Sequence, residues 1–493
     1  MATGADTKGS AATVQTELGD FEMYIDGQWV GAAGGAMLEI VDPATEKVVA
    51  RVANGDLVDA EAALAAARRA FDEGPWPRMP AAERATYLHA AAALLRDRVD
   101  ELARWETLEM GKLFSDGQGD MRRVADLLDY AAELAVRHLA DQPVAAPMAL
   151  VREPVGVVVG LCPWNFPLVL ASFKFASALA AGNVIIIKPA SVSPLTAIGM
   201  ARIFDEVGLP KGVFQVLVGP GRTVGDLLVT SPLVDMVTLT GSLEVGRQIM
   251  AKAAQTIKKV GLELGGKSPN IVFADADLDA ALDGVVFSAF GNCGQVCCAG
   301  TRLLIQRSIH DDFVAKLVER VEALRIGPGL DPTSELSPLV SADQREIVEG
   351  YVKLGLDEGA TLACGGERVD GPGFFYKPTV FTNVDNKMRI AQEEIFGPVL
   401  CVIPFDDEAD AVRIGNDTVF GLTAALWTSD TARGERVARA LRAGTVFVNN
   451  TWACAPLPLP WGGYKQSGIG REIGEVGIEE FSELKAVIFA GAS

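Results

Sequence analysis

Two adjacent thiols and one glutamate are the residues of this chain best suited to covalent chemistry. Cys297 and Cys298 lie within the glycine-flanked segment 294–300, where small neighbours would leave a thiol accessible. A catalytic thiol needs a base, because the thiolate is the nucleophile. Glu263 lies among apolar residues and glycines, which should raise its pKa and suit it to general-base work near neutral pH. A buried structural cysteine and a turn-capping glutamate would explain the same residues, and spacing alone cannot show that they meet.

The first of three predicted strand-to-helix turns carries Lys188 and Ser191, after a predicted strand at 184–187. A Lys just beyond a strand can reach a ribose hydroxyl or a phosphate. An acidic residue in this turn would hold the ribose 2′-hydroxyl of NAD and repel the 2′-phosphate of NADP. Because Ser191 removes that repulsion, the sequence predicts NAD or NADP as cofactor. A plain turn or cap role would also account for Ser191.

The other two turns contain glycines and a serine. Gly221 and Gly225 have a spacing close to the dinucleotide fingerprint GxGxxG, with one residue too many. Gly241 precedes Ser242, a good helix N-cap, and helix N-termini attract anions. Each signal is weak alone, because Gly and Ser are common at such turns. Three in neighbouring strand–helix units favour a dinucleotide.

The elements that must position these residues form two α/β series. Short buried strands alternate with helices over 156–256, which predicts a parallel, doubly wound sheet with right-handed connections. A second series over 270–449 predicts a second sheet of the same kind. Before them, a hairpin is predicted at 23–30, followed by mostly helical sequence. Residues 481–489 are a candidate edge strand.

Composition excludes several classes of function. The chain has 493 residues and a net charge of -20, which disfavours nucleic acid as a partner. The most apolar stretch, 155–173, is interrupted by prolines, so no membrane span or membrane partner is predicted. The seven cysteines form no disulfide framework, and no secretory signal is visible, so a reducing, cytoplasmic location is expected. With only three separated histidines, neither a metal site nor a His-based catalytic scheme is predicted.

Five motifs, in order, resemble the aldehyde dehydrogenase superfamily, and the match covers nearly all the chain after about residue 20. They are Pro163–Pro167 (PWNFP), Leu262–Lys267 (LELGGK), Gly294–Gly300 (GQVCCAG), Glu394–Pro398 (EIFGP) and Pro460–Lys465 (PWGGYK). The resemblance implies an α/β fold with two doubly wound, Rossmann-like units and a small β extension for oligomerisation. It also implies a homodimer or homotetramer, with the choice left open.

The resulting domain prediction has five parts. They are a disordered tail at 1–19, a dinucleotide-binding domain at 20–138 and 153–264, a catalytic domain at 265–465, and oligomerisation segments at 139–152 and 466–493.

The resemblance implies a role for each matching catalytic residue. Cys297 matches the thiol that attacks the aldehyde carbonyl, and hydride then passes to the nicotinamide. Asn165 and the backbone N–H of Cys297 would hold the oxyanion. Glu263 would activate the water that hydrolyses the thioester to a carboxylate. Lys174 and Glu472 match residues that relay protons away from Glu263.

Cofactor and substrate residues follow from the same resemblance. The cofactor set is Trp164, Lys188, Ser191, Gly221, Gly225, Gly241, Ser242, Leu264, Glu394 and Phe396. By analogy, Trp452, Cys454 and Trp461 belong to the substrate tunnel. Two Trp residues would suit an apolar, aromatic or cationic aldehyde, the last through cation–π contact, and core packing would explain them equally well.

Two other functions are compatible with the same motifs. One is a CoA-acylating semialdehyde dehydrogenase, a branch that generally lacks the glutamate base. The other is a non-catalytic binding protein of the same fold. Because Glu263, Cys297 and Asn165 are all present, the sequence favours hydrolytic oxidation of an aldehyde.

Overall fold

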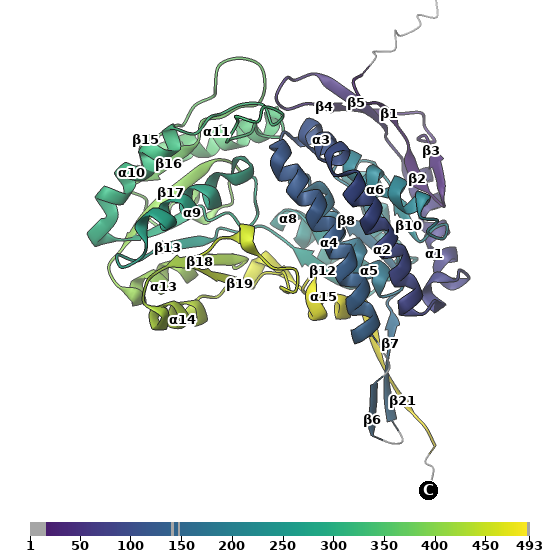
Figure 1. Cartoon of the computed structure of the whole chain (residues 1–493). Coiled ribbons are helices and arrows are strands. Elements are labelled where there is room, and N and C mark those ends of the chain that lie inside the picture. Colours follow the sequence, from purple (N-terminus) through teal and green to yellow (C-terminus); the bar gives the residue numbers. More distant parts are fainter. Residues whose placement is uncertain (1–15, 140–141, 146–147, 491–493) are drawn as a thin grey trace, which may run out of the picture.

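Two lobes, each built on a large and mostly parallel sheet, make up the body of the chain in the computed structural model (Figure 1). The structure describes residues 16–139, 142–145 and 148–490. The sheets have eight and seven strands, and helices cover them. The predicted α/β class with two doubly wound units is therefore confirmed.

The first lobe contains the eight-stranded sheet, in the order β20-β12-β11-β8-β9-β10-β2-β3. Strands β12 to β10 in this order are parallel, whereas β2, β3 and β20 are antiparallel to their neighbours. The strands are β2 (Met23–Ile25), β3 (Gln28–Val30), β8 (Val157–Leu161), β9 (Val184–Lys188), β10 (Phe214–Val216), β11 (Met236–Thr240), β12 (Lys259–Glu263) and β20 (Gly468–Ile469). The helices are α1 (Leu57–Asp72), α2 (Ala81–Asp97), α3 (Val99–Met110), α4 (Phe114–His138), α5 (Pro167–Ala180), α6 (Leu195–Glu206), α7 (Asp226–Thr230), α8 (Leu243–Ala253) and α15 (Gly474–Glu480).

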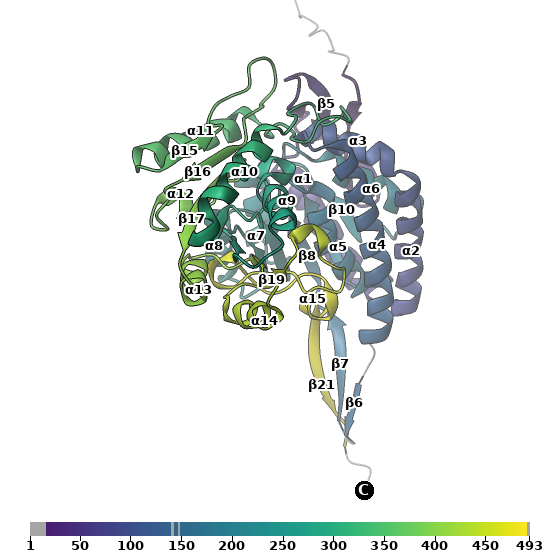
Figure 2. The ribbon, with the colours of Figure 1, turned by 60° about the vertical axis from the view of Figure 1, so that its left-hand side comes forward.

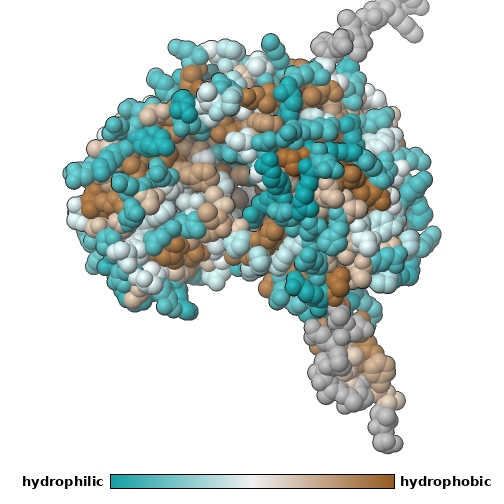
Figure 3. All heavy atoms as spheres, viewed as in Figure 1, coloured by the Kyte–Doolittle hydropathy of each residue, from teal (hydrophilic) through white to brown (hydrophobic). Residues whose placement is uncertain are grey.

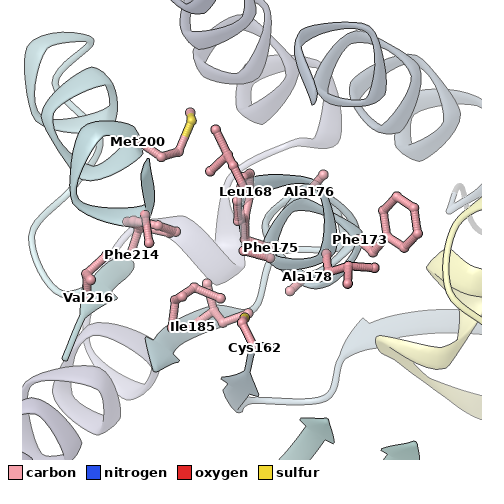
Figure 4. Packing of buried hydrophobic residues seen from close by; sticks show 14 of the residues in the cluster. Cys162, Leu168, Phe173, Phe175, Ala176, Ala178, Ile185, Met200, Phe214 and Val216 are labelled. Atoms are coloured by element: carbon pink, nitrogen blue, oxygen red, sulfur yellow. The ribbon is translucent and has the colours of Figure 1, made fainter. Parts of the chain in front are cut away.

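Helix α5 is buried along its whole length, because its sequence is apolar apart from Ser172, Lys174 and Ser177. It packs against β8, β9 and α6, and on its outer side against α4. Figure 4 shows Phe175 of α5 beside Ile185 of β9 and Phe214 of β10. The ring centroids of Phe175 and Phe214 are 5.6 Å apart. This rigid packing fixes the loop that precedes α5, which carries Asn165.

The second lobe contains the seven-stranded sheet, in the order β15-β16-β17-β14-β13-β18-β19, with only β15 antiparallel. Its strands are β13 (Pro269–Val272), β14 (Arg302–Gln306), β15 (Thr361–Cys364), β16 (Thr379–Thr382), β17 (Val399–Phe405), β18 (Thr423–Trp427) and β19 (Thr445–Val448). Its helices are α9 (Leu278–Phe290), α10 (His310–Glu322), α11 (Ala342–Asp357), α12 (Arg389–Gln392), α13 (Glu408–Asn416) and α14 (Thr431–Ala440).

A narrow arm projects from the first lobe in both ribbon views (Figures 1 and 2). It is an antiparallel sheet of β6 (Gln142–Ala145), β7 (Met148–Pro154) and β21 (Ser482–Ile488). Its surface carries exposed hydrophobic residues, including Leu484, Ile488 and Phe489, and Figure 3 shows hydrophobic atoms along it. The predicted β extension and edge strand are present here.

Several elements differ from the prediction. A sheet of β1 (Gly19–Phe21), β4 (Met37–Val41) and β5 (Val48–Ala53) lies in the third of the chain predicted to be mostly helical. Because β1 starts at Gly19, the tail predicted for 1–19 is too long, and residues 1–15 lie outside the described residues. The boundary predicted for the oligomerisation segment 466–493 is also wrong, because β20 lies within this segment and pairs with β12 in the main sheet. Both β1 and β20 form by backbone pairing with strands that are distant in sequence, and such pairing leaves no signal in the local sequence.

Within the described ranges, no helix is long and apolar enough to cross a membrane. In the same part of the chain, no group of three or more His, Cys, Asp or Glu side chains is arranged to hold a metal ion.

Candidate active site

Cys297 lies where two cavities meet. A cavity of about 390 Å³ and another of about 270 Å³ both have this residue in their walls. The Cys297 side chain is half-buried, whereas Cys298 is buried and lines only the larger cavity. A thiol at this junction can be approached from two sides by two different molecules.

A tight turn with left-handed backbone angles follows α9 and positions Cys297 between the two cavities. Asn292 and Gly294 both have positive φ angles, of 49° and 69°. The buried side chain of Gln295 stabilises the turn through two hydrogen bonds. Its Nε2 donates to the carbonyl oxygen of Asn292 (3.1 Å), and its Oε1 accepts from the backbone N–H of Val340 (2.9 Å). The loop that carries the thiol is therefore held by contacts within the second lobe.

Replacing Gly294 by Ala should destabilise the protein by about 2 kcal/mol or more, as expected for backbone strain combined with overpacking. An added β-carbon would lie 2.2 Å from the carbonyl oxygen of Gly397, at a φ angle that side chains rarely adopt. Urea unfolding measures the effect. The control is Gly350→Ala in α11, where a β-carbon meets no atom within 4 Å, so that the better helix former should stabilise slightly. Equal stability of the two variants would contradict the proposed strain.

Asn165 lies against the loop that carries the thiol. Its side-chain Nδ2 donates to the carbonyl oxygen of Gln295 (2.9 Å), and Asn292 Nδ2 donates to the carbonyl oxygen of Asn165 (3.1 Å). Asn165 is buried and lines the smaller cavity together with Cys297. An amide nitrogen has two N–H groups, so one remains for a developing oxyanion.

Glu263 is the last residue of β12 and is buried, and its Oε2 has no hydrogen-bond partner in the part of the chain that the structure describes. Burial raises its pKa well above the usual range, and the nearby Glu472 and Cys297 act in the same direction. Lys174 and Arg471 oppose the shift. The raised pKa that its apolar neighbours predicted is confirmed, and it suits a base near neutral pH.

A buried chain of polar groups continues from Glu263. Glu472 Oε1 accepts from Lys174 Nζ (2.6 Å) and from Thr238 Oγ1 (3.0 Å). Lys174 Nζ also donates to Thr240 Oγ1 (2.6 Å). Lys174 is fully buried, and Oε2 of Glu472 has no partner among the described residues. The structure thus brings together the three residues predicted to take part in proton relay.

The smaller cavity contains most of the predicted cofactor residues. Trp164 and Phe396 stand edge to face there, with ring centroids 5.2 Å apart. Glu394 Oε1 accepts from the backbone N–H of Gly266 (3.1 Å), and burial raises the pKa of Glu394 to about 7. A β-carbon on Gly265 would lie 2.0 Å from Glu394 Oε2, so this side chain needs a glycine beside it. The predicted residues that line this cavity are Trp164, Gly241, Ser242, Leu264, Glu394 and Phe396.

The remaining four predicted cofactor residues lie at the end of β9 or in the loops that follow the neighbouring strands β9 and β10. Lys188 is buried, which lowers its pKa to about 8, and its Cε lies 3.7 Å from where a β-carbon on Gly225 would be. Ser191 is half-buried, and the space around Gly221 is open. Parallel strands end at one edge of the sheet, where a dinucleotide binds in such folds. These residues fit the adenosine side of a cofactor.

The larger cavity has an aromatic wall. Trp452 contacts Phe287 (ring centroids 4.9 Å apart) and Phe166 (6.2 Å), and its neighbour Trp461 is buried. Phe173 of α5 completes the wall. Both Trp residues, which were predicted to belong to one substrate tunnel, thus line the same cavity. The three Phe residues were missed, because they lie in separate helices or loops and resemble ordinary core residues.

Cys454 does not line this cavity and is exposed, which corrects the prediction for this residue. Residues Trp452–Cys454 form a single 3₁₀ turn. Three successive residues of such a turn point in three directions, so all three cannot face one cavity.

A charged cluster at the start of α4 borders the same cavity. Lys112 is fully buried and pairs with Glu106 (2.6 Å) and with Asp120, while its ammonium lies 4.0 Å from the Phe166 ring centre. Asp116 lines the cavity one helical turn before Asp120 and forms no ion pair among the described residues. Nothing in the local sequence signals this cluster, because some 180 residues separate it from Cys297.

Comparison with known proteins gives one consistent result. A family model described as the aldehyde dehydrogenase family matches residues 29–487. A betaine aldehyde dehydrogenase of Bacillus subtilis is 44% identical over 473 residues, which cover 94% of this chain and 96% of that protein. An aldehyde dehydrogenase of Emericella nidulans is 41% identical over 483 residues, or 96% and 97% of the two chains.

Solved structures agree with this result. A betaine aldehyde dehydrogenase point mutant from Staphylococcus aureus, in complex with NAD+, superposes with a TM-score of 0.93 at 40% identity, over 96% of this chain and 98% of that one. An NAD-dependent aldehyde dehydrogenase from Sinorhizobium meliloti gives a TM-score of 0.94 at 41% identity, over 96% and 95%. The chain therefore belongs to the aldehyde dehydrogenase family and is an enzyme of that kind.

Proposed function

We propose that the protein oxidises an aldehyde to a carboxylic acid through a covalent intermediate on Cys297, with NAD or NADP as the hydride acceptor. The observation that carries this proposal is the shared wall of the two cavities, in which Cys297 is the common residue. We assign the smaller cavity to the cofactor and the larger to the aldehyde. In this scheme the first lobe binds the nucleotide, and the second lobe presents the thiol.

The first step is attack by Cys297 Sγ on the carbonyl carbon. Cys298 and burial raise the pKa of Cys297, so the resting group is a thiol that needs a base. Cys297 is among the groups that raise the pKa of Glu263, and this carboxylate can accept the proton. The Asn165 amide and the backbone N–H of Cys297 stabilise the oxyanion that forms. When bound, the oxidised nicotinamide supplies the hydride acceptor that turns this adduct into a thioester.

The second step is hydrolysis of the thioester. Glu263 first passes the proton that it took from the thiol to the buried pair of Glu472 and Lys174, which are 2.6 Å apart. It then removes a proton from a water molecule, whose oxygen attacks the acyl carbon, and the C–S bond breaks to release the Cys297 thiolate. Return of this second proton from Glu263 to the thiolate restores the resting thiol and the free base.

An assay of NAD(P)H formation with an aldehyde, with and without CoA, tests the proposal. We expect turnover without CoA, and a free carboxylic acid as product, because Glu263 is a buried carboxylate whose pKa is raised by burial and, to a smaller extent, by Cys297. A requirement for CoA, with an acyl-CoA product, would favour the acylating alternative. Failure to oxidise any of a panel of aliphatic, aromatic, cationic and carboxylated aldehydes would favour a binding protein.

Replacing Ser191 by Glu should raise the KM for NADP by at least about tenfold, because like charges brought together at an interface cost several kcal/mol. The KM for NAD should change far less, which makes it the internal control. Steady-state kinetics with both cofactors measure the effect. An unaltered ratio of the two KM values would show that Ser191 does not lie at the adenosine ribose site.

We further propose that the aldehyde carries a positive charge. The cavity is lined by the aromatic pair Trp452 and Phe287 and by Asp116, whose carboxylate forms no ion pair among the described residues. Two cations also line the cavity: Lys112 is paired with two carboxylates, and Arg123 donates to the carbonyl oxygen of Ala455 (2.9 Å). The name of the B. subtilis relative, a betaine aldehyde dehydrogenase, points to a cationic substrate of the same kind.

Replacing Trp452 by Ala should raise the KM for betaine aldehyde between about twofold and thirtyfold, the range of a cation–π contact. The matched control is 3,3-dimethylbutanal, which has the same shape without the charge. The KM for this uncharged aldehyde should rise less, because the variant then loses only the burial of apolar surface. If both substrates lose affinity equally in the variant, the cavity selects by shape and not by charge.

Two further features are proposals about the whole protein. The exposed apolar residues Leu484, Ile488 and Phe489 on the arm suit self-association through paired sheets, as a dimer or tetramer. A reducing, cytoplasmic compartment remains the proposed location, because the reaction needs Cys297 as a free thiol.

A further inference from the structure

A cavity of about 350 Å³ lies at the root of the arm, where β7 and β21 leave the first lobe (Figure 1). Its walls come from the start of α2, the end of α4, the residue after α5 and the ends of the two arm strands. It shares no residue with either of the cavities that meet at Cys297. A volume of this size is typical of a site for a small molecule.

Arg84 places a buried positive charge in the wall of this cavity, since the residue is only 7% exposed. Its Nε donates to the carbonyl oxygen of Ala180 (3.1 Å), and its Nη1 donates to that of Met79. Its Nη2 has no hydrogen-bond partner among the residues that the structure describes. Burial lowers the pKa of Arg84 to about 10, and no nearby carboxylate opposes this effect. Because buried charges are normally paired, this protonated guanidinium lacks a counter-ion.

The N-terminus of α2 adds to the positive character of the same wall. Pro80 precedes the helix and provides no side-chain cap. The backbone N–H groups of Ala81 and Ala82 have no hydrogen-bond partner in the described part of the chain, and both residues line the cavity. Unpaired N–H groups and the helix dipole favour an anion at this end of a helix.

The other charges around the cavity do not neutralise Arg84. Arg152 pairs with Glu479, and Glu153 pairs with Lys485, so both carboxylates of this group already have cationic partners. The carbonyl groups at the end of α5 offset only part of the charge on Arg84, because a helix C-terminus carries about half an elementary charge. The cavity is therefore positive overall and attracts anions.

Much of the remaining wall is apolar. Val136 and Leu139 come from the end of α4, and Pro154 is the last residue of β7. Val136 is exposed although it is apolar. Arg137, in the same turn of α4, offsets the terminal carbonyl groups of that helix. A ligand that matches both parts of the wall has one anionic group and a short apolar body.

We propose that this cavity is a binding site for a small organic carboxylate. The carboxylate would lie on Nη2 of Arg84 and the first turn of α2, and the apolar body would lie against Val136, Leu139 and Pro154. The planar guanidinium matches a carboxylate in shape as well as in charge. This inference goes beyond the proposed function, because it concerns a separate cavity and does not depend on turnover.

Titration calorimetry of the full-length protein with sodium benzoate tests the proposal. Benzoate should bind with a Kd on the order of 1 mM, as expected for so small a ligand. Benzyl alcohol has the same ring without the charge and should bind at least about tenfold more weakly, since it lacks the charge-assisted hydrogen bond. Sodium sulfate lacks the apolar body and should also bind more weakly. Sulfate binding as tight as that of benzoate would identify a site for inorganic anions and overturn the proposal.

Two variants of Ala82 locate the bound benzoate. Ala82→Asp adds a carboxylate to the cavity wall and should raise the Kd at least about tenfold, because like charges brought together cost several kcal/mol. Ala82→Asn has the same shape without the charge and should bind benzoate as the wild type does. Ala82 lines neither cavity at Cys297, so benzoate in the substrate cavity would bind both variants equally. Equal binding by the two variants would therefore overturn the proposal.

Arg84→Gln removes the buried charge itself and should abolish measurable binding of benzoate. Because Arg84 also caps the end of α5, circular dichroism must show that this variant is folded. Arg84→Lys keeps the charge without the planar group and should bind benzoate with intermediate affinity. If neither variant folds, the two Ala82 variants decide the question alone.

Thermal unfolding provides a second measurement that needs no activity. Benzoate should raise the Tm of the wild type and of Ala82→Asn, because a ligand of the native state stabilises it, but not that of Ala82→Asp. No binding of benzoate to the wild type, or unchanged binding by a folded Arg84→Gln, would overturn the inference. Benzoate binding at this cavity in a protein that oxidises no aldehyde would contradict the proposed function alone.

Discussion

Replacement of Cys297 by Ala is expected to lower kcat for aldehyde oxidation by on the order of 10⁴-fold or more, as for other covalent nucleophiles. Among the residues that the structure describes, Cys297 is the one that both cavities share, and it lies where carbonyl and cofactor would meet. Cys298, although adjacent, lines only the larger cavity and cannot replace it. Steady-state formation of NAD(P)H measures the loss.

The control for this experiment is Cys454→Ala, which removes an exposed thiol outside the cavity. Its kcat should stay close to that of the wild type. Cofactor binding by Cys297→Ala, followed by protein fluorescence, should persist because the Trp164 and Glu394 side of the site is untouched. A Cys297→Ala enzyme within tenfold of the wild-type rate would refute the covalent mechanism.

Replacement of Glu263 by Gln should lower kcat by about 10² to 10⁴-fold, the usual contribution of a general base. The amide cannot accept a proton from water, so the thioester should accumulate. Rapid mixing should then show a burst of NAD(P)H, of up to one equivalent per chain, followed by a slow steady state. Acid-quenched protein should carry the acyl group on Cys297. Absence of the burst would show that the first step, in which Glu263 accepts the thiol proton, depends on this residue more than hydrolysis does.

The pH profile provides an independent check of the same role. A base acts in its deprotonated form, so kcat should rise with pH through the pKa of Glu263. Burial and the nearby Glu472 place that pKa well above the usual range of a carboxylate, and the rising limb should therefore lie toward neutral or alkaline pH. Glu263→Gln should lose this limb. Glu475→Gln, which changes an exposed glutamate of α15, should keep it.

Several features could be predicted from the sequence because they depend on local residue types. Apolar runs bounded by turn residues gave the strands at 184–188, 302–306 and 423–427 to within one residue. The glycine-flanked thiols and the apolar setting of Glu263 indicated the chemistry, and the ordered motifs indicated the family.

Other elements could not be predicted because tertiary pairing creates them. Strand β12 has five residues, two of them Lys259 and Gly261, and gives no clear strand pattern alone. It forms because it lies between β11 and β20 in the sheet. That pairing sets Glu263 at the strand's end beside Glu472, which is distant in sequence.

What the sequence by itself determined is the set of reactive groups and the α/β class. Only the tertiary structure decided that Cys297 stands between two cavities, that Trp452 lines one of them while Cys454 faces away, and that Asp116 borders it. The physical reason is that nucleophilicity and strand or helix preference belong to a residue and its close neighbours. Cavity walls and buried charge pairs depend instead on how distant segments pack, and local sequence carries no signal of that packing.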